Sequence, residues 1–323
     1  MSEREIAVEN LVKLYPGDVR AVDDISLKVE AGSIFGFLGP NGAGKSTTIK
    51  ILTTLALPTT GQATVGGFDV VSDAACVRRI AGVALQEIGI DPLMKPMELL
   101  TLQGQLFGAS RTQAQARARE LLELVQLTDA ADRRAGTYSG GMRRRLDLAM
   151  ALVHQPKILF LDEPTTGLDP ASRRDVWTEV RRLNQELGIT IFLTTQYLEE
   201  ADELADTVAI IDRGKIATEG SPARLKAALG GESINLLFDS REMAEQALSE
   251  LTGMGDQIQL DRDVVRLYMK RASEMIPAVL NRLQQASLAP LSLTLTQPTL
   301  DDVFLQVTGQ RLETQDSPQA LAA

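Results

Sequence analysis

Residues 39–47, a run of nine, limit what this chain can fold into more than any other feature of its sequence. They match the pattern G-x-x-x-x-G-K-[ST] and follow an apolar run, residues 34–38, that suits a buried strand. In such a strand–loop–helix unit, glycines let backbone N–H groups surround a phosphate, the lysine reaches the β- and γ-phosphates, and the hydroxyl binds Mg²⁺. The alternative is a glycine-rich turn that binds nothing. The predicted nucleotide-binding residues are Gly39, Pro40, Asn41, Gly42, Ala43, Gly44, Lys45, Ser46 and Thr47.

The first two-thirds of the chain alternate short β-rich runs with helical stretches, which predicts an α/β domain with buried strands over residues 1–228. Between residues 87 and 156 the strand pattern stops, and three helical stretches predict a helical insertion. The predicted strands are residues 6–11, 25–29, 33–38, 63–65, 82–85, 158–161, 190–193, 208–211 and 216–218.

A different alternation follows two glycines at positions 230 and 231, which suit a linker. Its order, strand, helix, two strands, helix, strand, is that of a small ferredoxin-like βαββαβ unit of the α+β class. We therefore predict an accessory domain over residues 231–308, closed by a helix at 299–307. The polar, alanine-rich residues 309–323 predict a disordered tail.

Composition argues against several classes of protein. The 323 residues are 44% hydrophobic and 24% charged, close to average globular usage, which suits two folded domains. One cysteine and one histidine exclude a disulfide framework and a Cys/His zinc site within one chain. A net charge of −10 argues against nucleic acid as the main partner, and no apolar run reaches the roughly 18 residues that span a bilayer. If the protein acts at a membrane, another chain must supply the span.

A second apolar run, residues 158–161 after Lys157, ends in two carboxylates, Asp162 and Glu163. With a phosphate loop upstream, such a strand end suits a Walker B motif. We predict that Asp162 holds Mg²⁺, directly or through water, and that Glu163 is the general base that polarises the attacking water. Taken alone, the pair would be a strand end that faces water.

The segment 138–142, with Ser139, Gly140 and Gly141 at its centre, precedes Asp162 and opens a predicted helix. Its glycines leave N–H groups exposed at the positive end of that helix, which predicts a second anion site. The alternative is an ordinary serine N-cap.

With these motifs in this order, residues 5–220 resemble the ATP-binding subunit of ABC transporters. The resemblance implies the ABC type of P-loop nucleotide hydrolase fold, ATP and Mg²⁺ as cofactors, and ATPase activity. Residues 138–142 resemble the signature motif, with Tyr138 and Met142 where leucine and glutamine are usual. In this family the signature of one subunit closes over the nucleotide of another. Because this chain carries one copy of each motif, the resemblance implies a homodimer around two MgATP.

The resemblance also assigns single residues. Gln86 stands in the place of the Q-loop glutamine, which binds Mg²⁺ and senses the γ-phosphate, and Asp169 in the place of the D-loop aspartate. Tyr15 resembles the aromatic residue that stacks on adenine, the alternative being a tyrosine before a Pro-Gly turn. Gln196 stands where the family usually has a switch histidine. Glutamine can donate a hydrogen bond to the γ-phosphate but cannot take up a proton near neutral pH, so Glu163 carries the base role and Gln196 serves geometry and charge sensing.

Three segments, residues 138–146, 194–202 and 298–304, resemble the daunorubicin- and doxorubicin-resistance (DrrA-like) branch of the family. This resemblance implies a separate polytopic permease of the ABC-2 type and export of a drug, lipid or other amphiphile. It also implies a peripheral place at the cytoplasmic face of the bacterial cell membrane. The accessory domain would support dimerisation or regulation.

Several alternatives stay open at this stage. Three arginines at 143–145 suggest either contact with nucleic acid or lipid or a solvated or ion-paired helix face, and successive residues on a helix point in different directions, which favours the second. Residues 87–97 are either buried in the helical insertion or dock a permease helix. Two other functions compete: a nucleotide-gated binding module with little hydrolysis, prompted by Gln196, and a soluble ABC protein acting on nucleic acid or ribosomes, which the acidic balance disfavours.

Overall fold

The computed structural model describes residues 4–86 and 89–310. The chain divides into two compact units, one that ends at Glu219 and one that begins at Gly220. The second unit thus begins before the predicted linker at 230–231, because helix α8 (Pro222–Leu229) packs on helix α11 (Leu300–Thr308). The predicted disordered tail lies outside the described residues from position 311 onward.

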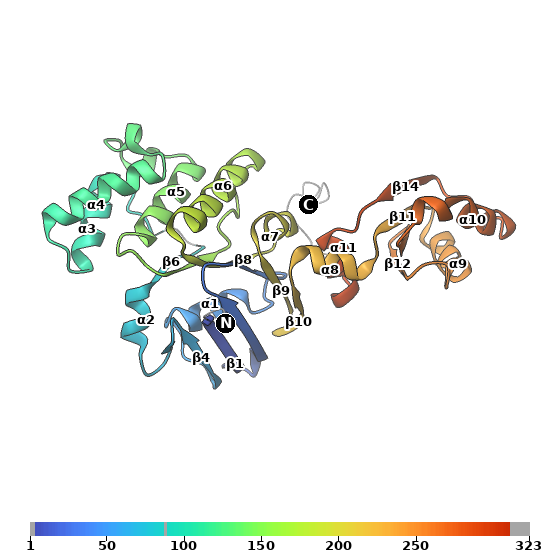
Figure 1. Ribbon diagram of the computed structural model, residues 1–323, viewed down its shortest axis with the longest axis horizontal. Helices are drawn as coiled ribbons and strands as arrows, with labels where there is room; N and C mark the ends of the chain where they lie inside the picture. The colour runs from blue at the N-terminus through green and yellow to red at the C-terminus, as the bar shows by residue number, and fades with distance from the viewer. Residues whose placement is uncertain (1–3, 87–88, 311–323) are drawn as a thin grey trace. The chain divides into compact units, whose positions relative to one another are not determined.

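A six-stranded sheet is the centre of the first unit (Figure 1). Its strand order is β10-β9-β3-β8-β7-β6, and the five strands from β9 to β6 run parallel. Strands β3, β7 and β8 are buried along their whole length, which explains the apolar runs at their centres. In a parallel sheet the carboxyl ends of the strands meet at one edge, where ligands bind. The strands are β3 (Ile34–Leu38), β6 (Ala81–Ala84), β7 (Ile158–Asp162), β8 (Thr190–Thr195), β9 (Thr207–Asp212) and β10 (Lys215–Gly220).

An antiparallel sheet of order β2-β1-β4-β5 encloses a second core against the parallel sheet. Helix α1 (Lys45–Leu52) contributes Ile49, Ile51 and Leu52 to this core, so the helix that follows the phosphate loop is fixed by apolar packing. The strands are β1 (Arg4–Tyr15), β2 (Val19–Glu30), β4 (Thr60–Val65) and β5 (Phe68–Asp69).

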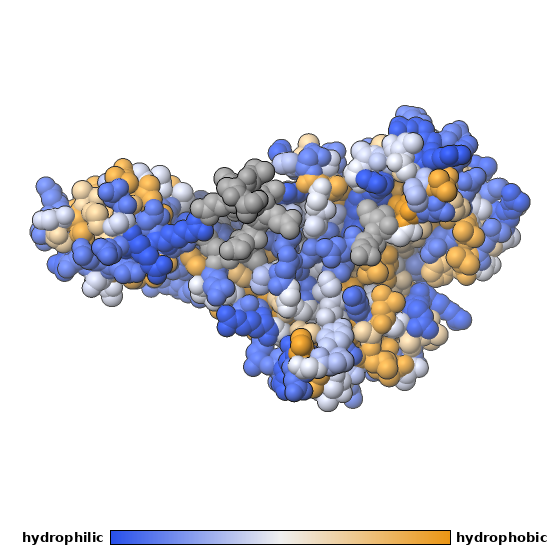
Figure 2. All heavy atoms as spheres, turned by 180° about the vertical axis from the view of Figure 1, so that it is seen from behind, coloured by the Kyte–Doolittle hydropathy of each residue, from blue (hydrophilic) through white to orange (hydrophobic). Residues whose placement is uncertain are grey.

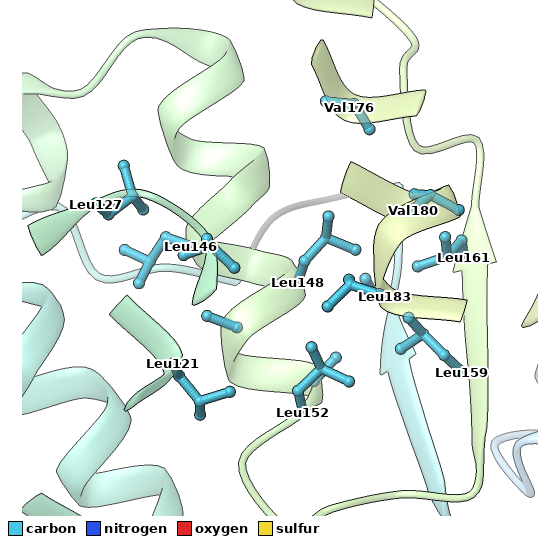
Figure 3. Packing of buried hydrophobic residues seen from close by; sticks show 14 of the residues in the cluster. Leu121, Leu127, Leu146, Leu148, Leu152, Leu159, Leu161, Val176, Val180 and Leu183 are labelled. Atoms are coloured by element: carbon cyan, nitrogen blue, oxygen red, sulfur yellow. The ribbon is translucent and has the colours of Figure 1, made fainter. Parts of the chain in front are cut away.

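The predicted helical insertion is present between β6 and β7. It holds α3 (Pro96–Leu106), α4 (Arg111–Leu124) and α5 (Gly140–Ala151), after α2 (Ala74–Ile80), which precedes β6. Helix α5 packs against α6 (Pro170–Leu187), and Figure 3 shows leucines of α5 facing leucines and valines of β7 and α6. The labelled residues of this core are Leu121, Leu127, Leu146, Leu148, Leu152, Leu159, Leu161, Val176, Val180 and Leu183. In the part of the chain that the structure describes, no helix is long and apolar enough to cross a bilayer.

The second unit has an antiparallel four-stranded sheet of order β12-β13-β11-β14. One face of the sheet packs against α9 and α10 in a separate apolar core. The element order, β-α-β-β-α-β, is the order expected from the sequence, and the ferredoxin-like name for this unit stays a prediction. The elements are β11 (Glu232–Leu237), α9 (Arg241–Leu251), β12 (Gln257–Asp261), β13 (Val264–Met269), α10 (Ala272–Gln285) and β14 (Ser292–Thr296).

Candidate nucleotide site

The loop after β3 requires glycine at two positions. At Gly39 a Cβ atom would lie 2.3 Å from the carbonyl oxygen of Ile211, and at Gly44 it would lie 2.3 Å from that of Ala21. Gly44 also has φ of +110°, in the region that favours glycine, and is the N-cap of α1. The loop backbone is thus held close to two neighbouring segments, and it leads into the N-terminus of α1 as the motif predicts.

Lys45 points back into this loop. Its side chain is 4% exposed, and its Nζ donates hydrogen bonds to the carbonyl oxygens of Gly39 (2.8 Å) and Pro40 (3.0 Å). The same Nζ lies 3.1 Å from Oε1 of Glu163. Burial lowers the pKa of Lys45 below its usual value, against the raising effect of Glu163. The structure therefore joins the predicted phosphate-binding lysine to the predicted general base.

Ser46 and Asp162 also meet at this edge. Ser46 Oγ donates to Asp162 Oδ1 at 3.1 Å, and Thr194 Oγ1 at the end of β8 donates to the same oxygen at 2.6 Å. Hydroxyl and carboxylate oxygens are the ligands that Mg²⁺ prefers, so the paired oxygens of Ser46 and Asp162 fit this ion. Gln86 is exposed and lies beside a cavity of about 400 Å³ that Glu163 also lines.

Glu163 has an unusual backbone. Its φ is +49°, a left-handed conformation that costs energy for a residue other than glycine. Its N–H donates to the carbonyl and hydroxyl oxygens of Thr194, both at 3.1 Å, and its Oε2 accepts from Thr166 Oγ1 at 3.1 Å. Thr194 thus positions both acidic residues. Sequence reasoning gave Thr194 no role, although a hydroxyl residue at the end of a neighbouring buried strand was a usable signal.

The signature residues lie elsewhere in the first unit. Ser139 is exposed and caps α5, its Oγ accepting from the N–H of Met142 at 3.2 Å, while Gly140 and Gly141 are half-buried. A Cβ at Gly140 would lie 3.0 Å from the Leu168 side chain, next to the predicted D-loop. Within the described residues, no hydrogen bond joins 139–141 to the phosphate loop.

Asp169 caps α6. It accepts hydrogen bonds from the N–H groups of Ala171 and Ser172 and from the Ser172 hydroxyl, which lower the pKa of this exposed carboxyl. Its predicted part at a dimer interface stays a prediction.

Two further candidates are Tyr15 and Gln196. Tyr15 ends β1, is 38% exposed, and has the Nζ of Lys13 5.1 Å from its ring centroid. Gln196 follows β8 and is 4% exposed. Their roles toward adenine and the γ-phosphate stay predictions.

The three arginines at 143–145 differ in their surroundings. Arg144 is buried and forms an ion pair with Asp147 at 2.9 Å, whereas Arg143 is exposed. An ion-paired helix face therefore describes this segment better than a basic surface patch.

A loop of the phosphate-binding pattern at the edge of a parallel sheet, joined to an aspartate and a glutamate at the end of another strand of that sheet, is the arrangement of a P-loop nucleotide hydrolase. A family model described as ABC transporter matches residues 22–166. The chain is 44% identical over 319 residues to the daunorubicin/doxorubicin resistance ATP-binding protein DrrA of Streptomyces peucetius, covering 98% of this chain and 96% of the relative. It is 42% identical over 309 residues to the daunorubicin resistance ATP-binding protein DrrA3 of Streptomyces coeruleorubidus, covering 96% and 97%.

A solved structure gives the same result. The dimeric, post-hydrolysis form of an ATP-binding cassette bound to ADP and Pi matches with a TM-score of 0.61 and 25% identity, over 67% of this chain and 98% of that one. The chain therefore belongs to the ABC transporter family, as an ATP-binding subunit with the ATPase domain of that family. The predicted family and the predicted fold of the first unit are confirmed.

Proposed function

We propose that this chain hydrolyses MgATP as one half of a homodimer and thereby drives a separate membrane permease that exports a drug, lipid or other amphiphile. The observation that carries the proposal is the cluster at the strand edge. There Lys45 lies 3.1 Å from Glu163, and Ser46 lies 3.1 Å from Asp162. The proposed phosphate loop, Mg²⁺ ligands and base thus lie together within one chain. The relatives named above support the exporter assignment.

The chain's own groups suggest the order of events. Lys45 binds the β- and γ-phosphates when they enter the loop, and in doing so leaves Glu163 Oε1. Glu163 is then free to accept a proton from the attacking water, while Thr166 holds its other oxygen in place. Ser46, Asp162 and Gln86 are the proposed ligands of Mg²⁺, which neutralises phosphate charge when bound.

The separation of the signature residues from the phosphate loop of the same chain supports a homodimer. Ser139 and the N–H groups at the start of α5 suit an anion, but no hydrogen bond within the described residues connects them with the loop of their own chain. Since the chain carries one loop and one signature, a second copy arranged head to tail supplies Ser139 to each nucleotide. Gln196 then completes the contacts to the γ-phosphate.

An apolar groove of about 410 Å³ on the first unit suits a permease helix. Its lining includes Leu55 and Phe107, which are 59% and 45% exposed, together with the charged residues Arg78 and Asp147. Figure 2 shows apolar residues (orange) over the part of this unit that holds α2 and α3. Such a patch marks an interaction site. We assign it to a permease of the ABC-2 type, which places the subunit at the cytoplasmic face of the bacterial membrane.

The segment 87–97 is divided between its two predicted roles. Ile90, Met94 and Met97 are partly buried against the helical core, which fits burial in the insertion. Gly89 lines the groove, and residues 87 and 88 lie outside the described part of the chain.

The substitution Glu163→Gln tests the proposal, because the amide keeps the shape of the side chain but cannot act as a base. We expect the variant to bind ATP about as tightly as the wild type, to hydrolyse it at least about 100-fold more slowly, and to form a dimer with MgATP. Binding is measured by equilibrium dialysis and the dimer by light scattering. The control is Glu186→Gln on the exposed face of α6, which should keep wild-type turnover. Normal turnover by Glu163→Gln would remove Glu163 as the base, and a chain that binds no ATP would remove the whole proposal.

A further inference from the structure

One buried arginine forms hydrogen bonds with three segments of the first unit. Arg144, on α5, is 3% exposed, and its Nη1 donates to the carbonyl oxygen of Leu85 at 2.8 Å and to Asp147 Oδ2 at 2.9 Å. Its Nη2 donates to the carbonyl oxygen of Asp162 at 3.4 Å. A single guanidinium thus joins the signature helix, the strand end before Gln86 and the Walker B strand.

Arg144 and two of its partners line two different cavities. Leu85 and Asp147 line the apolar groove of about 410 Å³ assigned above to a permease helix. Arg144 itself lines the cavity of about 400 Å³ that Gln86 and Glu163 share. The Arg144–Asp147 pair therefore forms the wall between the groove and the reaction edge.

We propose that Arg144 is a positioning residue that couples the groove to the strand edge, with Asp147 as its anchor on the groove side. The inference rests on the proposed function, because it takes the groove as the docking site. A guanidinium is planar with donors in fixed directions, so a movement of Asp147 is passed to the carbonyl groups of Leu85 and Asp162.

The network has room for a second arrangement. Arg144 Nε is buried with no hydrogen-bond partner, which is costly for a charged group, so the observed acceptors do not satisfy the whole guanidinium. A small shift of α5 past β6 can exchange one acceptor for another. The groove and the strand edge are thus coupled by an exchange of hydrogen bonds at Arg144, where α5 packs against β6.

Hydrogen–deuterium exchange tests this coupling without turnover. In the Glu163→Gln background, which keeps ATP bound, we expect MgATP to increase the protection of peptides that cover residues 81–86 and 147–154. Adding Arg144→Met should abolish that increase while ATP binding stays within about threefold. Arg119→Met, an exposed arginine on α4, is the matched control and should retain the increase. The inference would be overturned if MgATP increased protection equally with and without the Arg144→Met change. It would also be overturned if the Glu163→Gln variant bound ATP and showed no increase in protection. A parent that binds no ATP would instead count against the proposed function.

Steady-state kinetics in the otherwise wild-type chain separate positioning from mere stability. Arg144→Met should lower kcat about 10- to 100-fold and leave KM for ATP within about threefold, because misplaced groups slow the chemical step. Arg144→Lys keeps the charge but cannot reach every acceptor, so it should restore part of kcat. Asp147→Asn should lower kcat by itself and add little in the double variant with Arg144→Met. If Arg144→Met does not fold, Asp147→Asn and Arg144→Lys provide the test. Additive losses, or unchanged kcat in folded variants, would refute the coupling.

Discussion

Each of the two units buries a pair of opposite charges, and the two pairs are built differently. In the first unit, Lys45 and Glu163 lie 3.1 Å apart with side chains 4% and 5% exposed. In the second, Arg266 lies 3.1 Å from Asp302, with side chains 18% and 2% exposed, and 3.7 Å from Asp261. By distance and burial alone the two pairs would be given the same role.

The hydrogen bonds around each pair distinguish them. Asp302 is part of the capping box of α11 and accepts from the N–H and hydroxyl of Thr299, both at 2.9 Å, as well as from Arg266. These three hydrogen bonds all serve the fold of the second unit. Lys45 is held by loop carbonyls, and Glu163 has a strained backbone. Strain of this kind is common at functional sites, so we infer that the first pair exchanges partners with a ligand, whereas the second pair holds a helix.

Of the changes to the two pairs, Lys45→Ala should have the largest effect on ATP hydrolysis. The variant removes the only side-chain cation that the described structure places inside the phosphate loop, so we expect hydrolysis to fall by about 1,000-fold or more. Lys50→Ala, an exposed lysine on the same helix, is the control and should keep wild-type turnover. Phosphate release is measured at saturating MgATP, and thermal unfolding shows that both variants are folded. Turnover of Lys45→Ala within tenfold of the wild type would mean that the first pair is structural.

Asp302→Ala should lower the stability of the second unit and leave ATP hydrolysis nearly unchanged. The variant loses the hydrogen bonds that the buried carboxylate of Asp302 accepts, which typically costs about 1–3 kcal/mol, so the second unit should unfold at a lower denaturant concentration. Because the phosphate loop and strand edge belong to the first unit, ATP hydrolysis should stay within about twofold under conditions where the variant is folded.

The control for Asp302→Ala is Glu245→Ala, which breaks an exposed pair with Arg241 on α9. It should cost no more than about 0.5 kcal/mol. Unfolding is followed by urea titration of the full chain. Loss of ATP hydrolysis by Asp302→Ala without loss of stability would contradict the comparison, because it would give α11 a part in turnover.

The first pair could be predicted from the sequence because its two halves are local motifs on strands that end at one edge. A phosphate loop specifies its own backbone, and the parallel-sheet rule brings Lys45 and Glu163 together across more than 100 residues of chain. The second pair could not be predicted in this way. Asp302 lies in the segment 298–304, but neither that segment nor the surroundings of Arg266 in the sequence indicate that the two side chains pair. The tertiary contact of α11 with β13 brings them together.

Tertiary packing also decides the details that the sequence left open. Which arginine of 143–145 turns inward depends on how α5 packs, and the structure selects Arg144. Strands β1 and β2 extend beyond the predicted 6–11 and 25–29, because antiparallel pairing continues through exposed residues such as Leu14 and Arg20. Periodicity detects burial, and these ends pair mainly through exposed residues, with a side-chain contact such as the hydrogen bond from the N–H of Leu14 to Thr59 Oγ1 at 2.9 Å.

The smallest effect on kcat should come from Gln196→His. This variant tests whether ATP hydrolysis at the first site needs a titrating side chain other than the proposed base, Glu163. Gln196 is 4% exposed at the end of β8, and imidazole is close to glutamine in size. If Glu163 is the base and Gln196 serves geometry, the variant should keep kcat within about threefold of the wild type. Because the unperturbed pKa of histidine is about 6.5 and burial lowers it, the rate of the variant should gain a pH dependence below about pH 6.5 that the wild type lacks. Gln285→His, on the exposed end of α10, is the control and should leave the pH profile unchanged. A drop in kcat of more than about tenfold at every pH would show that the site is shaped for glutamine, and Gln196 would then belong with the strained groups of this edge as a residue fixed by local geometry.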